Sequence, residues 1–467
     1  MQFLPGQHIH LIGIGGAGLS AIARILLEKG CKVSGSDRSR NALTDALARD
    51  GATIYEGHDA SYVSGADCVI VSSAVQADHV EVAAACAQNI PVYKRADIMA
   101  ALMEGKRVIA VAGTHGKTTT TAMIVHILRE CGKDPSYIVG GVMRNTGTNA
   151  GVGKGQHFVV EADEYDNMFL GLRPDVAVIT NIEYDHPDFF KTKEEMFASF
   201  RRFVELLPMD GLLVACVDDL KASGLNGWRE AQNLPVASYS IVGLKAFWHG
   251  INIRSDGVQE TVFNVEFLGK KFGSVRLPVP GKHNVRNALA ALIVADHEQI
   301  PFECSTNALV SFQGTGRRFE LRGEVDGVAV IDDYAHHPTA IKVTLEAARQ
   351  RYPDRALWAV WQPHTYSRTQ ALMEEYAAAF DAADHVLVTN IYAAREQPIP
   401  GVTSAAVVAK MKHPDSRHTP SFEDTVKVLD QEVKAPAVIL IMSAGDAPAI
   451  GVEFLKRRQE RHANPAG

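Results

Sequence analysis

The chain has 467 residues, too many for a single hydrophobic core, and this length predicts about three domains. Apolar residues make up 46% and charged residues 22%, which is typical of a soluble globular protein. The formal net charge of −7 argues against nucleic acid or an anionic membrane as a partner, because their phosphates would be repelled, but local basic sites remain available for small phosphorylated ligands.

The N-terminal part of the chain alternates short apolar segments with a helical one. We expect a helix that ends at Gly30, and strands at residues 9–15, 32–37 and 68–73. Buried strands separated by helices are typical of a parallel sheet covered by helices. The sequence therefore predicts an α/β domain at the start of the chain.

The same α/β pattern starts again twice. Near Lys106 an apolar strand leads into a glycine loop and a helix. After Gly316 further strands are expected at residues 327–334, 357–364, 385–392 and 437–445. Domain boundaries near Glu104 and Gly316 follow from these restarts. They divide the chain into segments 1–104, 105–315 and 316–467.

The strongest local signal is the glycine loop after the strand at 107–113. Backbone N–H groups of such a loop, together with a helix N-terminus, suit phosphate oxygens. Lys117 would reach the β- and γ-phosphates of ATP, and the Thr118 hydroxyl would bind Mg²⁺. A plain turn is the alternative, since Val111 stands where the general pattern has its first glycine. The predicted ATP loop comprises Gly113, Thr114, His115, Gly116, Lys117, Thr118 and Thr119.

An earlier glycine loop also joins a strand to a helix and has the spacing of a dinucleotide fingerprint. Its residues are Gly13, Gly15, Gly16, Ala17 and Gly18. Asp37 ends the next strand, as the fingerprint requires. This loop alone is compatible with a structural turn or with NAD. Together with a separate ATP loop, it favours an enzyme that activates a nucleotide-linked substrate.

Ten motifs in order make the sequence resemble the Mur ligases over essentially the whole chain. The motifs are HLIGIGGAGLSAIA, VSGSD, VSSAV, GTHGKTTTTAM, EADEYD, TNIEYDHPDFF, VPGKHNVRNALAA, FQGTGRRFE, DDYAHHPT and QPHTYSRT. The resemblance implies a three-domain α/β architecture: an N-terminal Rossmann-like domain for a UDP-sugar, a central P-loop ATPase domain, and a C-terminal Rossmann-like domain for the amino acid. It also implies ATP-dependent ligation of L-alanine to the carboxylate of UDP-N-acetylmuramate through an acyl phosphate, in peptidoglycan precursor synthesis.

The resemblance also assigns site residues on the first two segments. It places the first glycine loop, Asp37, Ser72 and Ser73 at the UDP-sugar. Glu161 matches the family's acidic Mg²⁺ ligand, and His186 matches a histidine that helps to hold a second metal ion. Without the resemblance, His186 is more typical of a surface or capping histidine. The neighbouring acids can equally form a solvated rim: Asp163, Glu164, Asp166, Glu183 and Asp185.

Further residues are implied at ATP. His283, Asn284 and Asn287 would lie against the adenine. Amide and imidazole groups can form hydrogen bonds with the edge of this ring. Helix capping is the alternative for Asn284. Arg318 matches an arginine that contacts the phosphates, for which a guanidinium fork is well suited. Asp333 matches a contact to the ribose.

Three residues of the last segment are implied at the incoming alanine. They are Tyr334, His336 and Arg368. Arg368 would hold the alanine carboxylate through two hydrogen bonds, and His336 would help to remove a proton from the attacking amine. Because Glu161 and His186 belong to the central segment, we expect domain closure to bring the two groups together.

Two departures from close relatives keep an alternative open. Tyr165 and Thr365 stand where relatives often have serine and arginine. Tyr165 favours a ligase that attaches a whole murein tripeptide to the same sugar nucleotide, whereas the GIGGAG loop and YDHPDFF favour the alanine enzyme. An NAD(P)-dependent oxidoreductase would explain Asp37 but not the ATP loop, and a nucleotide-binding regulator would not need QPHTYSRT.

The cysteines and the apolar segments indicate a cellular location. The cysteines form no CxxC pair, so we expect reduced core residues rather than a disulfide or zinc framework. They are Cys31, Cys68, Cys86, Cys131, Cys216 and Cys304. No segment has the roughly 20 consecutive apolar residues that a membrane span needs, and the start lacks a basic signal-peptide region. The sequence predicts a cytoplasmic monomer or homodimer.

Overall fold

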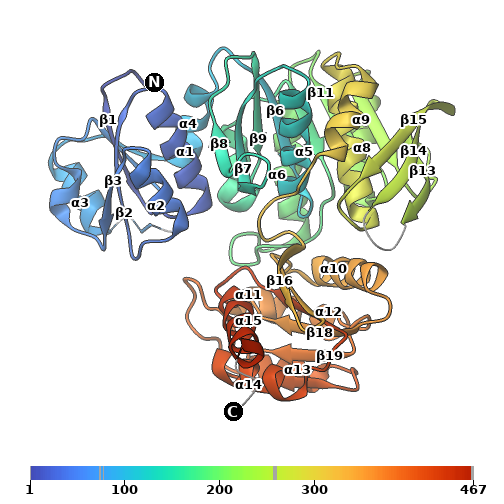
Figure 1. Ribbon diagram of the computed structural model, residues 1–467. Coiled ribbons are helices and arrows are strands. Elements are labelled where there is room, and N and C mark those ends of the chain that lie inside the picture. Colours follow the sequence, from blue (N-terminus) through green and yellow to red (C-terminus); the bar gives the residue numbers. More distant parts are fainter. Residues whose placement is uncertain (1, 73–74, 77, 256–259, 464–467) are drawn as a thin grey trace.

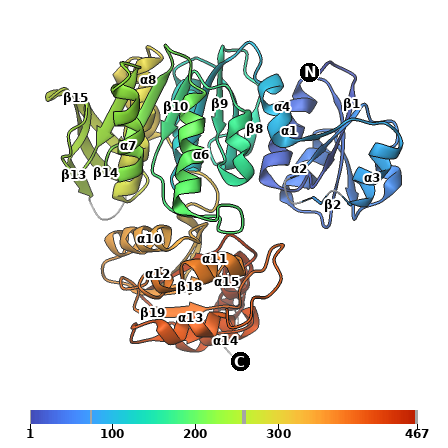
Figure 2. The ribbon, with the colours of Figure 1, turned by 180° about the vertical axis from the view of Figure 1, so that it is seen from behind.

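The computed structural model describes residues 2–72, 75–76, 78–255 and 260–463, and three sheets organise them (Figure 1). The sheets follow one another along the sequence and are covered by helices. The first sheet lies to the side of the second, and the third sheet lies below the second in both views (Figures 1 and 2). The boundaries predicted near Glu104 and Gly316 fall between sheets, and they stay predictions.

The first sheet has five parallel strands in the order β3-β2-β1-β4-β5. Its strands are β1 (His8–Ile12), β2 (Lys32–Asp37), β3 (Thr53–Glu56), β4 (Cys68–Val71) and β5 (Val92–Lys94). Its helices are α1 (Ala17–Glu28), α2 (Ala42–Arg49), the 3₁₀ helix η1 (Ala60–Val63), α3 (Val80–Ala87) and α4 (Arg95–Leu102). The parallel, helix-covered sheet that the sequence predicts is confirmed.

The second sheet has ten strands, and a parallel centre carries antiparallel additions at both ends. Its strands are β6 (Arg107–Ala112), β7 (Ser136–Met143), β8 (Thr148–Gly151), β9 (His157–Glu161), β10 (Val176–Ile179), β11 (Leu212–Cys216), β12 (Val236–Ser240), β13 (Trp248–Ser255), β14 (Thr261–Phe267) and β15 (Lys270–Leu277). Its helices are α5 (Lys117–Glu130), the 3₁₀ helix η2 (Tyr165–Gly171), α6 (Lys193–Glu205), α7 (Leu220–Glu230), α8 (Lys282–His297) and α9 (Phe302–Val310). The antiparallel strands were not predicted.

The third sheet has six strands in the order β16-β17-β21-β18-β19-β20. Its strands are β16 (Glu320–Val325), β17 (Val328–Asp333), β18 (Ala356–Trp361), β19 (His385–Val388), β20 (Ser416–His418) and β21 (Ala437–Met442). Its helices are α10 (Pro338–Arg351), α11 (Tyr366–Ala371), α12 (Met373–Ala377), α13 (Ser404–Lys410), α14 (Phe422–Glu432) and α15 (Pro448–Ala463). Within the described ranges, no helix has both the length and the apolar character needed to cross a membrane.

The prediction that all six cysteines are reduced core residues is wrong for three of them. Cys131, which caps the C-terminal end of α5, forms a disulfide with Cys304 of α9, with their Cα atoms 6.0 Å apart. Cys86 is exposed and free. The sequence separation of 173 between the bonded cysteines explains the error, because only the packing of α5 against α9 brings them together. The remaining three cysteines are buried thiols, as predicted.

The disulfide predicts a result for thiol counting. In denaturant without reductant, a maleimide should label only the free thiols of Cys31, Cys68, Cys86 and Cys216. After reduction, Cys131 and Cys304 should be labelled as well. Intact-mass spectrometry measures both counts. Cys304→Ser is the control and should give the same count before and after reduction; equal counts in the unchanged protein would contradict the disulfide.

Candidate functional site

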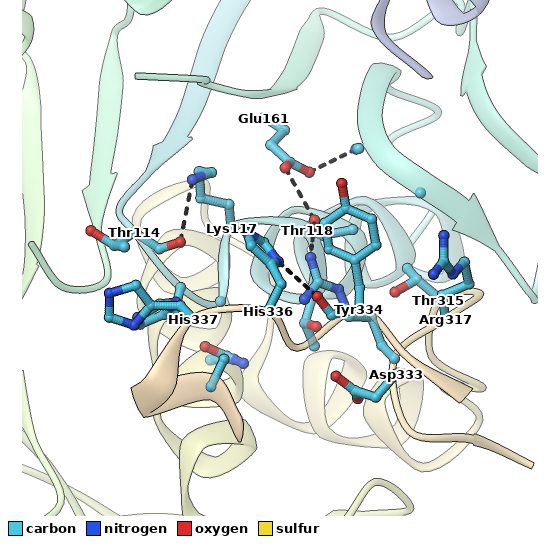
Figure 3. A pocket seen from close by; sticks show the side chains of 18 of the residues that line it. Thr114, Lys117, Thr118, Glu161, Thr315, Arg317, Asp333, Tyr334, His336 and His337 are labelled. Atoms are coloured by element: carbon cyan, nitrogen blue, oxygen red, sulfur yellow. Dashed lines mark hydrogen bonds between the residues drawn. The ribbon is translucent and has the colours of Figure 1, made fainter. Parts of the chain in front are cut away.

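A cavity of about 1090 Å³ lies where the three parts of the chain meet. Its wall combines the start of α1, the glycine loop before α5, and the loops that follow β9, β17 and β18. Tyr334 and His336 of the third part extend toward Thr118 and Glu161 of the second (Figure 3). Most of the predicted site residues therefore line one cavity.

The loop between β6 and α5 requires glycine at two positions. Gly113 has a φ of +138°, and a Cβ atom there would lie 2.0 Å from the Thr180 hydroxyl. Gly116 has a φ of +83°, and a Cβ atom there would lie 2.6 Å from the Asn287 amide oxygen. Val111, at the position of the general pattern's first glycine, is a buried residue of β6. The loop leaves the N-terminus of α5 facing the cavity, as phosphate binding requires.

Lys117 is the first residue of α5, and its ammonium is held by a buried carboxylate. Its Nζ atom lies 2.7 and 2.9 Å from the two carboxylate oxygens of Glu164 and donates to the Gly113 carbonyl. Burial lowers the pKa of Lys117, but Glu164 and Asp163 more than offset this and raise it above its ordinary value. Lys117 therefore remains a cation inside the cavity.

Glu161 and Thr118 bring together oxygen atoms that could bind a cation. Glu161 ends β9, and its carboxylate accepts hydrogen bonds from the Thr118 hydroxyl at 3.0 Å and the Gly140 N–H at 2.7 Å. Burial raises the pKa of Glu161, while Lys117 and Arg318 oppose that change. A carboxylate and a hydroxyl in contact are the hard oxygen ligands that Mg²⁺ prefers, so these residues fit the predicted cation.

His186 lies on the other side of Glu164. Its Nε2 atom is 3.6 Å from a Glu164 oxygen and 3.7 Å from an Asp185 oxygen. Burial lowers the pKa of His186, but Asp185 and Glu164 more than offset this and raise it. Glu164 thus joins Lys117 to His186, and its side chain is fully buried. The alternative that Glu164 belongs to a solvated acidic rim is therefore wrong.

Arg368 is already engaged across the domains. Its Nε atom donates to Asp185 at 2.6 Å, and its Nη1 and Nη2 atoms approach the Nδ1 atoms of His364 at 2.9 Å and His186 at 3.4 Å. The side chains of Arg368 and Asp185 are only 4% and 5% exposed. Burial raises the pKa of Asp185, but Arg368 holds it well below its ordinary value. Arg368 and His186 therefore lie together in this structure, and the expectation that domain closure brings them there stays a prediction.

His336 is a neutral imidazole at the cavity wall. Its Nδ1–H group donates to the Tyr334 carbonyl at 2.8 Å, which leaves the lone pair on Nε2. Burial, together with Arg368, holds the pKa of His336 well below its ordinary value. The ring of Tyr334 packs edge-on against His336, with centroids 5.2 Å apart. His336 is therefore equipped to accept a proton at Nε2.

The predicted ATP contacts surround the same loop. Arg318 donates to the Thr118 hydroxyl at 3.3 Å and lies over the Tyr334 ring. Both carboxylate oxygens of Asp333 accept backbone N–H groups at 2.7 Å, from Phe319 and Ala335. Asp333 thus fixes the connection between the second and third sheets. A ribose hydroxyl bound by Asp333 would have to share the carboxylate oxygens with these two backbone N–H groups.

The start of α8 faces the loop as well. The side chain of Asn284 donates to the Pro280 carbonyl at 2.6 Å and accepts from Asn287 at 3.1 Å. Gly281 is the N-cap residue and no side chain caps the helix, so the capping alternative for Asn284 is not what the structure shows. Burial lowers the pKa of His283 to about 4. Neutral imidazole and amide edges at this wall suit an adenine.

The first glycine loop reaches the cavity only with its last two residues, Ala17 and Gly18. The Gly15 N–H donates to the Asp37 carboxylate at 2.8 Å, so Asp37 orders the loop. A Cβ atom on Gly13 would lie 3.0 Å from Ser72. Gly13, Gly15, Gly16, Asp37 and Ser72 therefore cluster at the end of the first sheet, outside the cavity wall. Ser73 lies outside the described residues.

Several cavity residues were missed by sequence reasoning. Glu164 and Asp185 stand inside the quoted motifs, but nothing in a motif reveals burial. Tyr165 donates to Asp188 at 2.9 Å, and Arg395 of the third part contacts both. Tyr165, which departs from the family pattern, therefore helps to join the second and third parts. Thr365 is buried at a φ of +64°; its N–H donates to the Tyr392 carbonyl at 2.9 Å, and its own carbonyl accepts from the Thr369 hydroxyl at 2.7 Å.

Comparisons with known proteins agree along the whole chain. The Mur ligase family, catalytic domain matches residues 8–107, the Mur ligase middle domain matches 111–295, and the Mur ligase, glutamate ligase domain matches 317–445. The curated UDP-N-acetylmuramate–L-alanine ligase of Desulfatibacillum aliphaticivorans is 41% identical over 453 residues, which span 96% of this chain and 98% of that protein.

Two solved structures extend this similarity to three dimensions. The crystal structure of a UDP-N-acetylmuramate–alanine ligase from Thermotoga maritima has a TM-score of 0.81 at 28% identity and covers 97% of this chain and 99% of its own. A murein peptide ligase from Psychrobacter arcticus has a TM-score of 0.74 at 28% identity with the same coverage. Both share the arrangement of all three parts.

Proposed function

The chain belongs to the Mur ligase family, and on this premise we propose that it joins L-alanine to the carboxylate of UDP-N-acetylmuramate with conversion of ATP to ADP and phosphate. One observation carries the proposal. A single cavity collects the ATP loop, the end of the UDP-sugar loop and the amino-acid residues of the third part. An amide-forming ligase must hold these three substrates together.

The reaction proceeds in two steps. A carboxylate oxygen of UDP-N-acetylmuramate attacks the γ-phosphorus of ATP, and the bond to the β–γ bridging oxygen breaks, which gives an acyl phosphate and ADP. The amine of alanine then attacks the acyl carbon, loses a proton, and inorganic phosphate leaves. Phosphoryl transfer of this kind depends mainly on positioning and on charge neutralisation.

The residues of α5 and β9 serve the first step. Lys117 provides the cation beside the transferred phosphoryl group, and Arg318 brings a second one from the third part. Thr118 and Glu161 would hold Mg²⁺, with His186 at a second site; the ion would neutralise phosphate charge. Glu164 orients Lys117 and His186 from between them.

The residues of the third part serve the second step. His336 presents a free Nε2 lone pair, to which the attacking amine could pass a proton. Arg368 positions Asp185 and His186, and its remaining N–H groups are available for a carboxylate. We infer that the amino acid binds at this contact between the second and third parts of the chain. Cytoplasmic location and a monomeric or dimeric state remain part of the proposal.

The murein tripeptide ligase remains the second candidate, since a murein peptide ligase shares the fold. The curated relatives, which are 40–43% identical over nearly their full lengths, carry the alanine name and favour the first candidate. The oxidoreductase alternative does not fit a chain of this family.

Calorimetry tests the nucleotide assignment. UDP-N-acetylmuramate should bind, and NAD(H) should give no heat at the same concentrations, because the first loop is paired with a separate ATP site. UDP is a useful control for the nucleotide moiety alone. Tight NAD binding without binding of UDP-N-acetylmuramate would contradict the proposed function.

A further inference from the structure

Arg95 is a mostly buried cation whose side chain makes no hydrogen bond to the described residues. It is the first residue of α4, and its side chain is only 16% exposed. Its Nε atom is completely buried without a partner, and among the described residues its side chain makes no hydrogen bond. The nearest carboxylate oxygen, on Asp163, is 3.9 Å from Nη1. A guanidinium has five N–H donors, so most of its bonding capacity is unused.

Its position connects both phosphate loops. The Nη1 atom lies where a Cβ atom on Gly18 would be 2.4 Å away, so the guanidinium covers the first turn of α1. Arg95, Gly18 and Lys117 line the same cavity. In both views α4 lies at the junction of the first and second sheets (Figures 1 and 2). The N-terminus of α1 adds partial positive charge at this place.

The surrounding backbone fixes Arg95 in this place. A Cβ atom on Gly171, at the end of η2, would lie 2.3 Å from the carbonyl oxygen of Ala96. The start of α4 is therefore in tight contact with the segment that follows Glu164. A guanidinium that is removed from water needs an anion with matching geometry, and one carboxylate at 3.9 Å does not provide it.

We propose that Arg95 forms an anion-binding subsite that takes an oxyanion of the sugar nucleotide, either its diphosphate or its carboxylate, and so fixes the substrate between the two loops. The proposal rests on the proposed function, because that function supplies the anion. The guanidinium fork binds two oxygens of either group. On this proposal Arg95 binds the sugar nucleotide rather than ATP.

Calorimetry with Arg95→Met tests the subsite. Methionine keeps the apolar stem and removes the donors. Affinity for UDP-N-acetylmuramate should fall about 10- to 100-fold, the loss expected for a charge-assisted pair, while ATP affinity stays unchanged. Arg40→Met is the matched control, since Arg40 lies in the same part of the chain, is exposed and pairs with Asp45. It should leave affinity unchanged.

Two comparisons complete the test. If affinity for UDP and UDP-N-acetylglucosamine falls as well, the diphosphate is the anion; if only UDP-N-acetylmuramate is affected, its carboxylate is. Unchanged affinity for all three ligands would overturn the subsite. If Arg95 had only a structural role, Arg95→Met would lower the melting temperature of the protein without ligand. If Arg95 serves the ligand, its lack of hydrogen bonds predicts an unchanged melting temperature. If the unchanged protein binds no UDP-sugar, the proposed function itself fails.

Discussion

Lys117→Ala should reduce ligation about 1000-fold or more while UDP-N-acetylmuramate still binds. Lys117 provides the ammonium at the start of α5, where charge develops on the transferred phosphoryl group. The substitution also leaves the carboxylate of Glu164, which is fully buried, without its nearest cation. An uncompensated buried charge costs about 3 kcal/mol or more, so the variant should also be less stable. ADP release and urea unfolding measure the two effects.

A double variant separates the two effects. Lys117→Ala combined with Glu164→Gln removes the unpaired charge, so we expect stability to recover and activity to stay lost. If the double variant regained turnover, the loss in the single variant would have come from misfolding. Lys117 would then not be the residue that neutralises the phosphate.

Arg368→Ala should impair both steps of the reaction. The sequence alone predicts a selective loss of alanine binding, but the structure shows Arg368 bonded to Asp185 and near His186. Truncation would leave the carboxylate of Asp185 buried and unpaired, at a cost of about 3–5 kcal/mol. Asp185 and His186 would then be displaced, and acyl-phosphate formation would fall with alanine use. Borohydride trapping without alanine and urea unfolding measure these effects.

Arg395→Ala is the matched control for Arg368→Ala. Arg395 also forms an ion pair from the third part to the second, with Asp188 at 3.0 Å, but its side chain is 43% exposed. Exposed pairs contribute about 0–1 kcal/mol, so this variant should stay nearly as stable as the unchanged protein. Normal trapping and normal stability in Arg368→Ala, with only a weaker alanine affinity, would restore the role of carboxylate clamp.

The parts of the fold that follow local patterns were predictable. The buried strands β1, β2, β4 and β6 and the helix α5 lie where apolar runs and glycine loops place them. The antiparallel strands β14 and β15 mix buried residues with partly or fully exposed ones, and only their pairing with β13 and with one another makes them part of the sheet. The disulfide between Cys131 and Cys304 also depends on tertiary packing.

The site shows the same division. The contact between Thr118 and Glu161 was predictable, because Glu161 ends β9 and Thr118 lies at the start of the helix that follows the neighbouring parallel strand β6. Arg368 and Asp185 are 183 residues apart, and each is buried only because the other neutralises it. Arg95 stands in no quoted motif, and its importance arises from the hydrogen bonds that it lacks.

An ADP-release assay tests the proposed reaction most directly. ATP, Mg²⁺ and UDP-N-acetylmuramate would be held constant while L-alanine, glycine, L-serine and the murein tripeptide are compared, with mass spectrometry of the product. We predict ADP release that requires both the sugar nucleotide and L-alanine, and a product extended by one alanine residue. Turnover with the tripeptide and none with L-alanine would contradict the proposed function and assign the chain to the tripeptide reaction.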